Sequence, residues 1–491
     1  MQVIQRTESQ RDTIYWCLVG LALVLRFVWM GDARFFWDEA TFMGMALQHN
    51  IDGEWAQYAL KGTRGVVYGP FAIWIFQIYL KIGSLFGAGV LFYFYLSALI
   101  HSATWLLGMI WLKKLFHWMP VWMIAAAALS PFFFHYSRML WDNPFLIELT
   151  LLLFCSGWSF VQAPKVWKIA LAAFLAAASF LIHLMAIPMI ASMGIFMVWK
   201  QKSWILKNAL VVMAILLGMA AWTYPYVSIL LQSLASSDTQ GVGFGAWNTK
   251  FLEGIFVGFA VISHLGGAYF LGNEAPLWIT MLAHLCAITG IVFGAFFLTG
   301  LGKALLLGKS VEDSDRPLIS FFRIYWIVLL IFAYATKMGG HPHYFNGTWV
   351  GFFLLTAWSL QKFLKSPKVE FKMVIMVLAL AMTGILNQLF YHHFNHGSRA
   401  KHQGVTIENQ LQIAEELIEK SIPTSGVSFQ DAKFSYLTRN FEFLTTYLKF
   451  TGRDAELMKD SDTQTQQNAR LVWADDEQKG AKKTGRIKLV Y

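Results

Sequence analysis

Long apolar stretches recur through the first 392 residues and are separated by short polar connections. A transmembrane helix needs about 20 mainly apolar residues to cross the hydrocarbon core of a bilayer. Stretches that approach this length predict an all-α polytopic membrane protein with eleven to thirteen crossings. They are 13–31, 68–86, 90–112, 119–136, 143–162, 166–182, 184–199, 207–230, 252–271, 277–301, 318–336, 344–362 and 370–391.

The positions of lysine and arginine select among these topologies, because short cytoplasmic loops are enriched in positive charge. If all thirteen stretches cross, the basic connections lie on both sides of the membrane. If 68–86 and 252–271 lie along or dip into the outer face, every basic connection lies inside and about eleven helices cross. The step Gly69-Pro70 suits such an interfacial segment. The basic connections are Arg6/Arg11, Lys113/Lys114, Lys165/Lys168, Lys200/Lys202/Lys207, Lys303/Lys309/Arg316 and Lys362/Lys365/Lys368.

The eleven-crossing topology places all of the chemically interesting segments on the outer face. The inner face receives short basic loops that contain no catalytic set. We expect 231–276, which carries Gly241, Gly243 and Gly245, to form a lid. The outer segments are the long first loop 32–89, the short connection 137–142, the segment 231–276, the turn 337–343 and the tail 393–491.

Composition divides the chain into two parts. Of its 491 residues, 56% are hydrophobic and 14% are charged, against about 45–50% and about 25% in soluble domains. Residues 393–491 carry 27 of the 68 charged side chains. We therefore predict a membrane domain over 1–392 and a small extracytoplasmic α/β domain over 393–491. Its amphipathic stretch 406–420 predicts a helix, and Arg470–Trp473 and Arg486–Tyr491 predict strands.

Several protein classes are excluded by the same figures. The composition excludes a soluble multi-domain protein, a disordered chain and a collagen-like chain. The three cysteines, Cys17, Cys155 and Cys286, lie in apolar runs, which is typical of core residues rather than of a disulfide or zinc set. Nucleic acid is not an expected partner, because the inner loops largely explain the net charge of +10.

The first outer loop opens with an aromatic and acidic run, Arg34-Phe-Phe-Trp-Asp38-Glu39-Ala40. One interpretation is a membrane interface, with aromatic rings at headgroup level and acids in water. The other is a carboxylate held at the bilayer surface as a general base. Adjacent residues point in different directions, so we expect Asp38 and Glu39 to have separate roles.

The second outer connection places Arg138 and Asp142 four residues apart between two spans. On a helical turn they would form an ion pair. Alternatively, Arg138 faces an anionic group of a ligand and Asp142 supports the site. The last outer turn carries His341 and His343 around a proline. These histidines are candidates for a phosphate or sugar contact, and a metal is the weaker alternative because no third ligand is fixed.

The order of these motifs resembles the GT-C superfamily of integral-membrane glycosyltransferases. The similarity covers roughly residues 10–392. Within the superfamily, the chain is similar to bacterial members related to protein O-mannosyltransferases and to the aminoarabinose transferase of lipid A. The motifs are the acidic pair in the first loop, the helix that begins at Tyr68-Gly69-Pro70-Phe71, and the turn that contains Ser130-Pro131, Ser137-Arg138 and Asp142.

The resemblance implies an activity and a set of site residues. It implies that Asp38 is the catalytic carboxylate, that Asp142 is the second acid, and that the donor is a polyprenyl-phosphate sugar. Tyr68 stands where the family has histidine, which removes one polar contact and affects the subfamily assignment. Some relatives hold a divalent metal with Glu and His, for which Glu39 with His264 or His343 are candidates here. No cofactor is otherwise implied.

Physical chemistry agrees with these implications. Asp38 would take the proton of an acceptor hydroxyl or amine as it attacks the anomeric carbon, in a direct displacement that inverts this centre. Cations on the outer face would meet the charge of the departing polyprenyl phosphate; the candidates are Lys61, Arg64, Arg138 and Lys337. We expect a hexosyl or pentosyl transferase of a bacterial plasma membrane, acting outside on a lipid, glycan or protein acceptor.

Three other functions remain open at this point. A polytopic transporter or lipid flippase of the cell envelope would explain the spans and the polar residues within them, namely Arg26, His183, Arg323 and Asn387. It does not explain why acids and cations gather on one face, and no inverted repeat supports it. The other two are a transferase of oligosaccharide blocks and a non-catalytic assembly protein.

Overall fold

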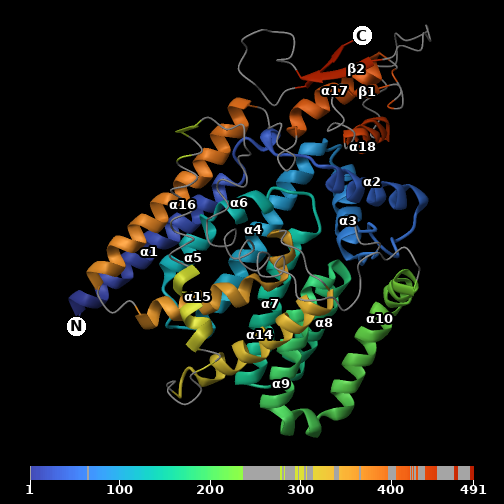
Figure 1. Cartoon of the computed structure of the whole chain (residues 1–491). Helices are drawn as coiled ribbons and strands as arrows, with labels where there is room; N and C mark the ends of the chain where they lie inside the picture. The colour runs from blue at the N-terminus through green and yellow to red at the C-terminus, as the bar shows by residue number, and fades with distance from the viewer. Residues whose placement is uncertain are drawn as a thin grey trace.

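The computed structural model is a bundle of membrane-length helices that carries a mixed α/β segment at one end (Figure 1). It describes residues 2–62, 66–235, 277–278, 281, 294–296, 298–303, 306, 313–336, 342–363, 367–395, 405–420, 422, 424, 427–429, 437–450, 469–473 and 487–490. The membrane part contains α1 (Gln2–Leu25), η1 (Met30–Asp32), α2 (Trp37–Asp52), α3 (Phe71–Leu85), α4 (Val90–Leu115), α5 (Val121–Ala128), α6 (Pro131–Tyr136), α7 (Asn143–Gln162), α8 (Val166–Ile182), η2 (Leu184–Ala186), α9 (Ile187–Lys207), α10 (Ala209–Ala235), α14 (Arg316–Thr336), η4 (Pro342–Thr348), α15 (Trp349–Phe363) and α16 (Pro367–Asn395).

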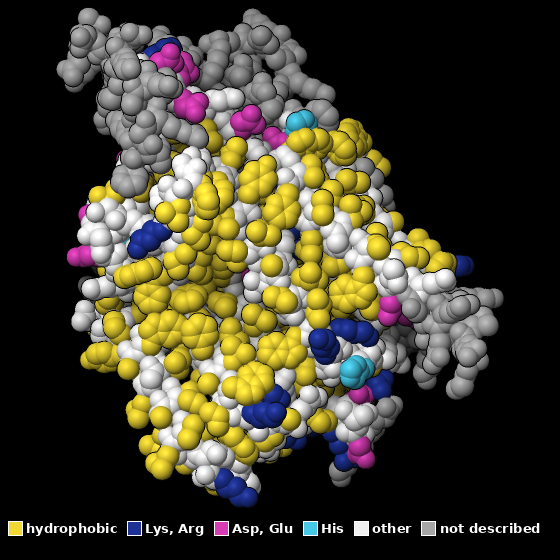
Figure 2. All heavy atoms as spheres, turned by 180° about the vertical axis from the view of Figure 1, so that it is seen from behind, with side chains coloured by type: hydrophobic (Ala, Val, Ile, Leu, Met, Phe, Trp, Pro, Cys, Tyr) yellow, Lys and Arg dark blue, Asp and Glu magenta, His cyan; other side chains and the backbone are white. Residues whose placement is uncertain are grey.

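Six of the described helices are long and apolar enough to cross a bilayer. They are α4, α7, η2 with α9, α10, α14 and the stretch Glu370–Phe390 of α16. The apolar helices α3 and α8 are shorter. Figure 2 shows that hydrophobic side chains cover most of one face of the body, as contact with lipid tails requires. The fold is therefore that of a polytopic helical membrane protein, as the apolar pattern predicts.

The predicted span over 119–136 is not a single helix. It is divided into α5 and α6, which are separated at Leu129 and Ser130, and Pro131 opens α6. Proline has no N–H to donate and its ring clashes with the preceding turn, so it starts a new helix rather than continuing one. All eight residues of α5 are buried, so this segment lies inside the bundle. The predicted span 252–271 and most of 231–276 and 277–301 lie outside the described residues.

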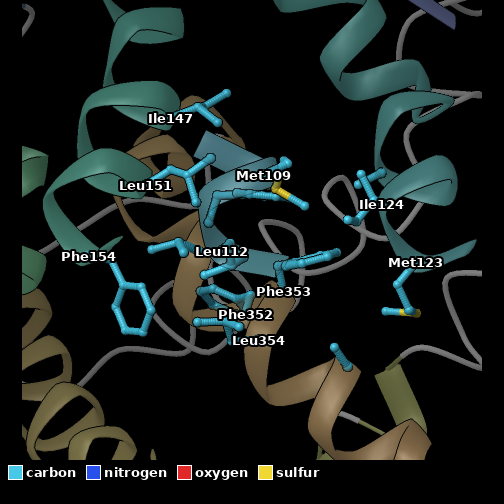
Figure 3. Close-up of a cluster of buried hydrophobic side chains, with 14 of the residues drawn as sticks. Met109, Leu112, Met123, Ile124, Ile147, Leu151, Phe154, Phe352, Phe353 and Leu354 are labelled. Carbon is cyan, nitrogen blue, oxygen red and sulfur yellow. The ribbon is translucent and has the colours of Figure 1, made fainter. Parts of the chain in front are cut away.

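The main hydrophobic core lies where α4, α5, α7 and α15 meet. Side chains from all four helices converge in Figure 3, with Met109 and Leu112 of α4 at the centre of the view. Burial of large aliphatic and aromatic side chains contributes about 1.5–3 kcal/mol each. This core fixes the ends of the helices that carry the outer connections.

A second core holds the first outer loop against the membrane helices. Its centre is formed by α2 and α3, which pack against each other. Gln77 of α3 hydrogen-bonds to the segment that connects them. The Gln77 side chain donates to the carbonyl of Glu54 at 2.8 Å and accepts from the Ala56 N–H at 3.2 Å. Gly69, at the start of α3, lies against the Leu181 carbonyl, and any side chain there would collide with α8. The start of α3 is thereby fixed.

The C-terminal segment contributes two helices and a small sheet. The predicted helix over 406–420 and the two predicted strands are confirmed as α17, β2 and β3. β1 pairs in parallel with β2, and β2 pairs antiparallel with β3, with Arg470 opposite Val490. Figure 1 places this segment at the end of the molecule that also carries α2. Its elements are α17 (Ile407–Glu419), β1 (Val427–Phe429), α18 (Leu437–Phe450), β2 (Ala469–Trp473) and β3 (Ile487–Val490).

Candidate functional site

The acidic pair of the first outer loop lies at the beginning of α2. The backbone is extended at Phe36 and turns helical at Trp37, which leaves the first N–H groups of the helix in need of acceptors. Glu39 accepts from the Phe36 N–H at 2.8 Å and, with its other oxygen, from the Leu140 N–H at 2.9 Å. Glu39 is fully buried. It therefore joins the first outer loop to the second outer connection.

Asp38 has a different environment from its neighbour, as expected for adjacent residues on a helix. Its side chain is half-buried, and burial raises its pKa to about 6, while the charges of Arg34 and Arg439 act in the opposite direction. Burial also raises the pKa of Glu39 to about 7, again opposed by Arg34. Desolvation disfavours a charged carboxylate, and a nearby cation favours it. Asp38 is thus the more readily ionised member of the pair.

Asp142, from the second outer connection, lies close enough to Asp38 for their charges to interact. Asp142 is buried, and its Oδ1 accepts from the Asn143 side chain at 2.9 Å, whereas Oδ2 has no partner among the described residues. Burial and the charge of Asp38 raise its pKa well above the ordinary value. The structure therefore brings together two acids that are 104 positions apart in the sequence, one favouring the ionised form and the other the protonated form.

Arg138 does not form the predicted helical ion pair with Asp142. Residues 137–142 form turns and bends rather than a helix, so the spacing of four does not align the two side chains. The Arg138 guanidinium donates to the Trp29 carbonyl at 2.7 Å and lies over the Phe134 ring at 4.9 Å. Burial lowers its pKa to about 10, which leaves it charged. Arg138 thus supports the wall of the site from its buried position.

Trp29 is held in an uncommon backbone conformation that serves this contact. Its φ is 47° and its ψ is 55°, the left-handed region that a bulky residue rarely adopts. The conformation costs about 1–3 kcal/mol and persists only where surrounding contacts fix it. These contacts are the hydrogen bond from Arg138 and the stacking of the Trp29 ring on His393 of α16, with ring centroids 4.0 Å apart. Strain of this kind is typical of functional sites.

A small polar cavity lies beside the acids, between the first outer loop and α16. Its volume is about 30 Å³, room for one or two water molecules. Gln388 of α16 is buried in its wall, and neither amide atom has a hydrogen-bond partner among the described residues. Asp32 Oδ2 lies at hydrogen-bond distance from His393 Nδ1, 2.9 Å away. The lining residues are Asp32, Ala33, Arg34, Phe134, His135, Arg138, Met139 and Gln388.

Sequence analysis did not select four charged or polar residues that line this cavity: Asp32, Arg34, His135 and Gln388. Arg34 precedes Asp38 by four residues, and this spacing is a signal that was present in the motif. Asp32 directly follows the first apolar stretch and carried a weaker signal. Gln388 lies in an apolar run, and its place beside the acids depends on how α16 packs, which no local pattern encodes.

The structure describes some of the other candidate residues and leaves the rest outside the described ranges. Lys61 is exposed on the loop between α2 and α3, in a bridge with Val67. Tyr68 contacts the ring of His183 at a centroid distance of 4.4 Å. Burial lowers the pKa of His183 to about 4, and its Nδ1 accepts from the Met185 N–H, so it stays neutral and caps η2. Arg64, His264, Lys337 and His341 lie outside the described residues, and so does the side chain of His343, which belongs to η4.

The described residues contain no group of three or more His, Cys, Asp or Glu side chains that would hold a metal ion. Glu39, one of the metal candidates, uses both oxygens to accept backbone N–H groups. These bonds favour a role in joining the two loops over metal coordination. The metal candidates that involve His264 or His343 stay predictions.

A second polar cluster lies among the membrane helices, where the end of α1 meets α4 and α7. His101 Nδ1 lies 3.2 Å from Glu148 Oε1, and Arg26 donates to Ser102 at 3.3 Å. Arg26, His101 and Glu148 are all buried. The sequence singled out Arg26 but not Glu148, although a lone acid in an apolar span is a recognised signal. A groove of about 310 Å³ beside it is lined by Phe71, Ile75, Ile78, Tyr79, Ile100, His101, Thr104, Phe145, Glu148 and Leu149.

Comparisons with known proteins identify the fold. No family model matches the sequence, and no curated protein matches it. The crystal structure of ArnT from Cupriavidus metallidurans in the apo state superposes with a TM-score of 0.52 at 14% identity, over 94% of this chain and 92% of that one. ArnT bound to undecaprenyl phosphate gives 0.51 at 14%, over 94% and 93%. The chain therefore shares the fold of ArnT, and the predicted polytopic helical membrane fold is confirmed.

Proposed function

We propose that this chain is a membrane glycosyltransferase that moves a sugar from a polyprenyl-phosphate donor to an acceptor. The observation that carries the proposal is the convergence of Asp38 and Asp142 at one end of a helical bundle with the ArnT fold. A fold alone does not determine function. The proposal rests on the fold together with a pair of carboxylates of opposed protonation preference, which acid–base chemistry on a sugar requires.

The donor class is suggested by a relative of similar fold. ArnT has been captured with undecaprenyl phosphate. In this chain, the apolar groove beside α7 offers a place for a prenyl chain. Glu148 in its wall lies six residues beyond Asp142 along α7, or about 9 Å. A chain in this groove would place its phosphate and sugar near the level of Asp38 and Asp142.

The proposed reaction is a direct displacement at the anomeric carbon. An acceptor oxygen or nitrogen attacks this carbon while its proton passes to the Asp38 carboxylate. The bond from the anomeric carbon to the phosphate oxygen breaks, and polyprenyl phosphate leaves with the electron pair. The anomeric centre is inverted. A pKa of about 6 leaves Asp38 ionised at neutral pH and still basic enough to accept the proton.

The other two acids have supporting roles in this proposal. Glu39 spends both oxygens on backbone N–H groups, so it has none to offer an acceptor. Burial raises the pKa of Asp142 well above its ordinary value, which favours its protonated form. It can therefore donate a hydrogen bond to the donor or acceptor through its partnerless oxygen. Asp38 is the remaining candidate for the base.

Cations beside the acids would stabilise the departing phosphate. Arg34 faces both Asp38 and Glu39, and Lys61 is exposed on the loop that follows α2. A phosphate carries charge that Arg and Lys donors meet with strong hydrogen bonds. We assign phosphate binding to Arg34 and Lys61, and keep Arg64 and Lys337 as further candidates. Contacts of Tyr68, His341 and His343 with the sugar stay predictions.

We place this site on the extracytoplasmic side of a bacterial plasma membrane. The basic connections, expected on the cytoplasmic side, support the choice of side. A polyprenyl-linked sugar is a suitable donor there, because the lipid holds the activated sugar at the membrane surface. The acceptor would be a lipid, a glycan or a protein that reaches the same surface. The membrane domain over 1–392 would carry the chemistry.

The test is a transfer assay with the purified protein in liposomes. A panel of labelled polyprenyl-phosphate sugars is offered together with a membrane extract as acceptor, and sugar release and transfer are followed. We expect transfer with one donor, lost in Asp38→Asn and retained in Asp52→Asn, a matched change at the exposed end of α2. Transfer that survives in a folded Asp38→Asn would move the base to another residue.

One observation favours a second candidate function, transport or flipping of a lipid. The buried cluster of Arg26, His101 and Glu148 lies between membrane helices beside a groove, and polar groups at membrane depth often mark a transport path. The same liposomes distinguish the two functions. Movement of the labelled lipid between leaflets without any sugar transfer would favour the transporter.

A further inference from the structure

The C-terminal segment holds the stretch of backbone that leads into Asp38. Gln410 of α17 and Asn440 of α18 both donate to the Phe35 carbonyl at 2.8 Å, and the Asn440 amide also donates to Gln410 at 2.7 Å. The Ile407 N–H donates to the Ala33 carbonyl at 2.8 Å. These hydrogen bonds join parts of the chain that are more than 370 positions apart. The segment is thus built into the site rather than attached beside it.

Arg439, next to Asn440 on α18, projects onto the first turn of α2. Its guanidinium lies over the Trp37 ring at 5.1 Å and donates to Thr41 Oγ1 at 3.4 Å. Trp37 and Thr41 flank Asp38 along α2, one residue before it and three after it. Arg439 is exposed, so its charge costs little in desolvation. These two contacts, one with Trp37 and one with Thr41, hold the Arg439 guanidinium next to Asp38.

Two cations and two acids lie around Asp38. Arg34 of the first outer loop and Arg439 of α18 favour its ionisation, whereas burial opposes it. The charge of Asp38 in turn raises the pKa of Glu39 of α2 and of Asp142 of the second outer connection. Without Arg439, Arg34 would be left among the described residues as the cation that counters the burial of Asp38.

We propose that Arg439 is a positioning residue of this site, which the C-terminal segment supplies to keep Asp38 ionised. The proposal deepens the transferase function and rests on Asp38 being its base. Arg439 itself touches α2 and acts on the reaction through Asp38. The C-terminal segment would then set the pH range in which the membrane domain works.

Labelling with a water-soluble carbodiimide tests this proposal without any sugar donor. The reagent reacts with protonated carboxyl groups, so the labelling of Asp38, followed by peptide mass spectrometry between pH 5 and pH 8, reports its ionisation. We expect a midpoint of about 6 in the wild type and a midpoint at higher pH in Arg439→Gln. Loss of a nearby opposite charge moves a carboxyl pKa by about half a unit or more, which raises labelling at pH 7 about two- to threefold.

Two variants control for fold and for long-range charge. Arg439→Lys keeps the cation and should keep the midpoint near that of the wild type. Lys420→Gln removes the same charge from the end of α17, where Lys420 pairs with Glu416 at 3.0 Å, and should leave the midpoint unchanged. An unchanged midpoint in Arg439→Gln would overturn the proposal. So would an equal shift in Lys420→Gln, which would show a general charge effect.

Transfer kinetics form the second arm of the test. The acid limb of the kcat/KM profile should move to higher pH in Arg439→Gln and return in Arg439→Lys, whereas a merely structural defect would lower activity equally at every pH. If no donor is used by the wild type, the proposed function fails while the labelling result still decides the role of Arg439. If transfer occurs and neither the labelling midpoint nor the acid limb moves in Arg439→Gln, the proposed role of Arg439 is overturned while the proposed function stands.

Discussion

Asp38 and Glu39 are neighbours in the sequence with distinct physical situations. The first turn of α2 directs Glu39 into the protein, where two backbone N–H groups meet its carboxylate, and leaves Asp38 half-exposed beside two arginines. Burial dominates the pKa of both residues, but the compensating contacts differ. The environment of each residue, rather than its chemical type, is therefore the reason why the proposed mechanism takes Asp38 as the base.

Glu39→Gln should change how stability depends on pH. Burial raises the pKa of Glu39 from 4.5 to about 7, so the folded state binds its proton more tightly than the unfolded state. The contribution of Glu39 to the free energy of unfolding is then complete below pH 4.5 and decreases as the pH rises towards 7. We expect the Tm of the wild type to fall relative to that of Glu39→Gln over this range, measured by thermal unfolding in nanodiscs. A difference in Tm that is constant from pH 4.5 to 7 would contradict this account.

Asp142→Asn should be milder than Asp38→Asn. Asparagine has the shape of a protonated aspartic acid and keeps a hydrogen-bond donor, so Asp142→Asn should retain about a tenth of wild-type kcat/KM at pH 7. Loss of a general base typically costs about 10²–10⁴-fold, which we expect for Asp38→Asn. Transfer kinetics of both folded variants with the productive donor provide the comparison. Equal and complete loss in both variants would mean that Asp142 also exchanges a proton with the substrate.

At the scale of elements, the bundle positions the site through a few fixed helix ends. α7 begins directly after Asp142, and α2 begins directly before Asp38. Most predicted apolar stretches within the described residues form helices, because apolar length is a local property. α7 and α8 match their predicted bounds, 143–162 and 166–182, although α8 is too short to count among the six candidate spans. The break at Pro131 shows where length alone misleads, since proline ends a helix within an otherwise continuous apolar run.

The site was only partly predictable for a related reason. Asp38 and Asp142 each lie beside a membrane helix on the same predicted side, so their approach follows from topology. Gln388 and Arg439 reach the site only through the packing of α16 and α18, which depends on contacts between residues hundreds of positions apart. Glu148 gave a usable signal as a lone acid in an apolar span, but its partner His101 did not.

Glu148→Gln should destabilise the bundle through the buried cluster that joins α1, α4 and α7. Glu148 lies 3.2 Å from His101 and is the acid whose charge acts on Arg26. Removing the partner of a buried polar group typically costs about 1–3 kcal/mol, and Glu148→Gln also leaves the charge of Arg26 less compensated. The double variant Arg26→Met, Glu148→Gln should recover part of this loss, as thermal unfolding in nanodiscs would measure. Glu54→Gln, an exposed change between α2 and α3, is the matched control.

A double-mutant cycle decides whether the cluster is coupled. Contacting residues show interaction energies of about 0.5–3 kcal/mol, whereas distant ones add. Additive effects of Arg26→Met and Glu148→Gln would mean that the two charges do not compensate each other. The expected coupling would mark the cluster as a structural element of the bundle and weaken the case for a transport path.

At the scale of the whole molecule, helices of the C-terminal segment lie against elements from the N-terminal part of the chain. α18 packs against α2, α17 packs against α18 and η1, and all share one hydrophobic core. The hydroxyl groups of Tyr447 of α18 and Tyr93 of α4 lie 2.9 Å apart. Figure 1 shows this end of the molecule, where the last helices lie beside one of the first. The first outer loop therefore packs against α4 and α7 on one side and against the C-terminal segment on the other.

This arrangement predicts that the C-terminal segment controls the rigidity of the first outer loop. In the double variant Gln410→Ala, Asn440→Ala, the Phe35 carbonyl loses both side-chain donors, at about 1 kcal/mol each. Local opening of the backbone before Asp38 should become about tenfold more frequent or more, and tryptic cleavage after Arg34 should accelerate in proportion. Thr445→Ala serves as the control, since Thr445 hydrogen-bonds only the Phe441 and Glu442 carbonyls of its own helix. Unchanged cleavage in the double variant would mean that the membrane helices alone hold the loop, and the C-terminal segment would then act on Asp38 through charge and not through geometry.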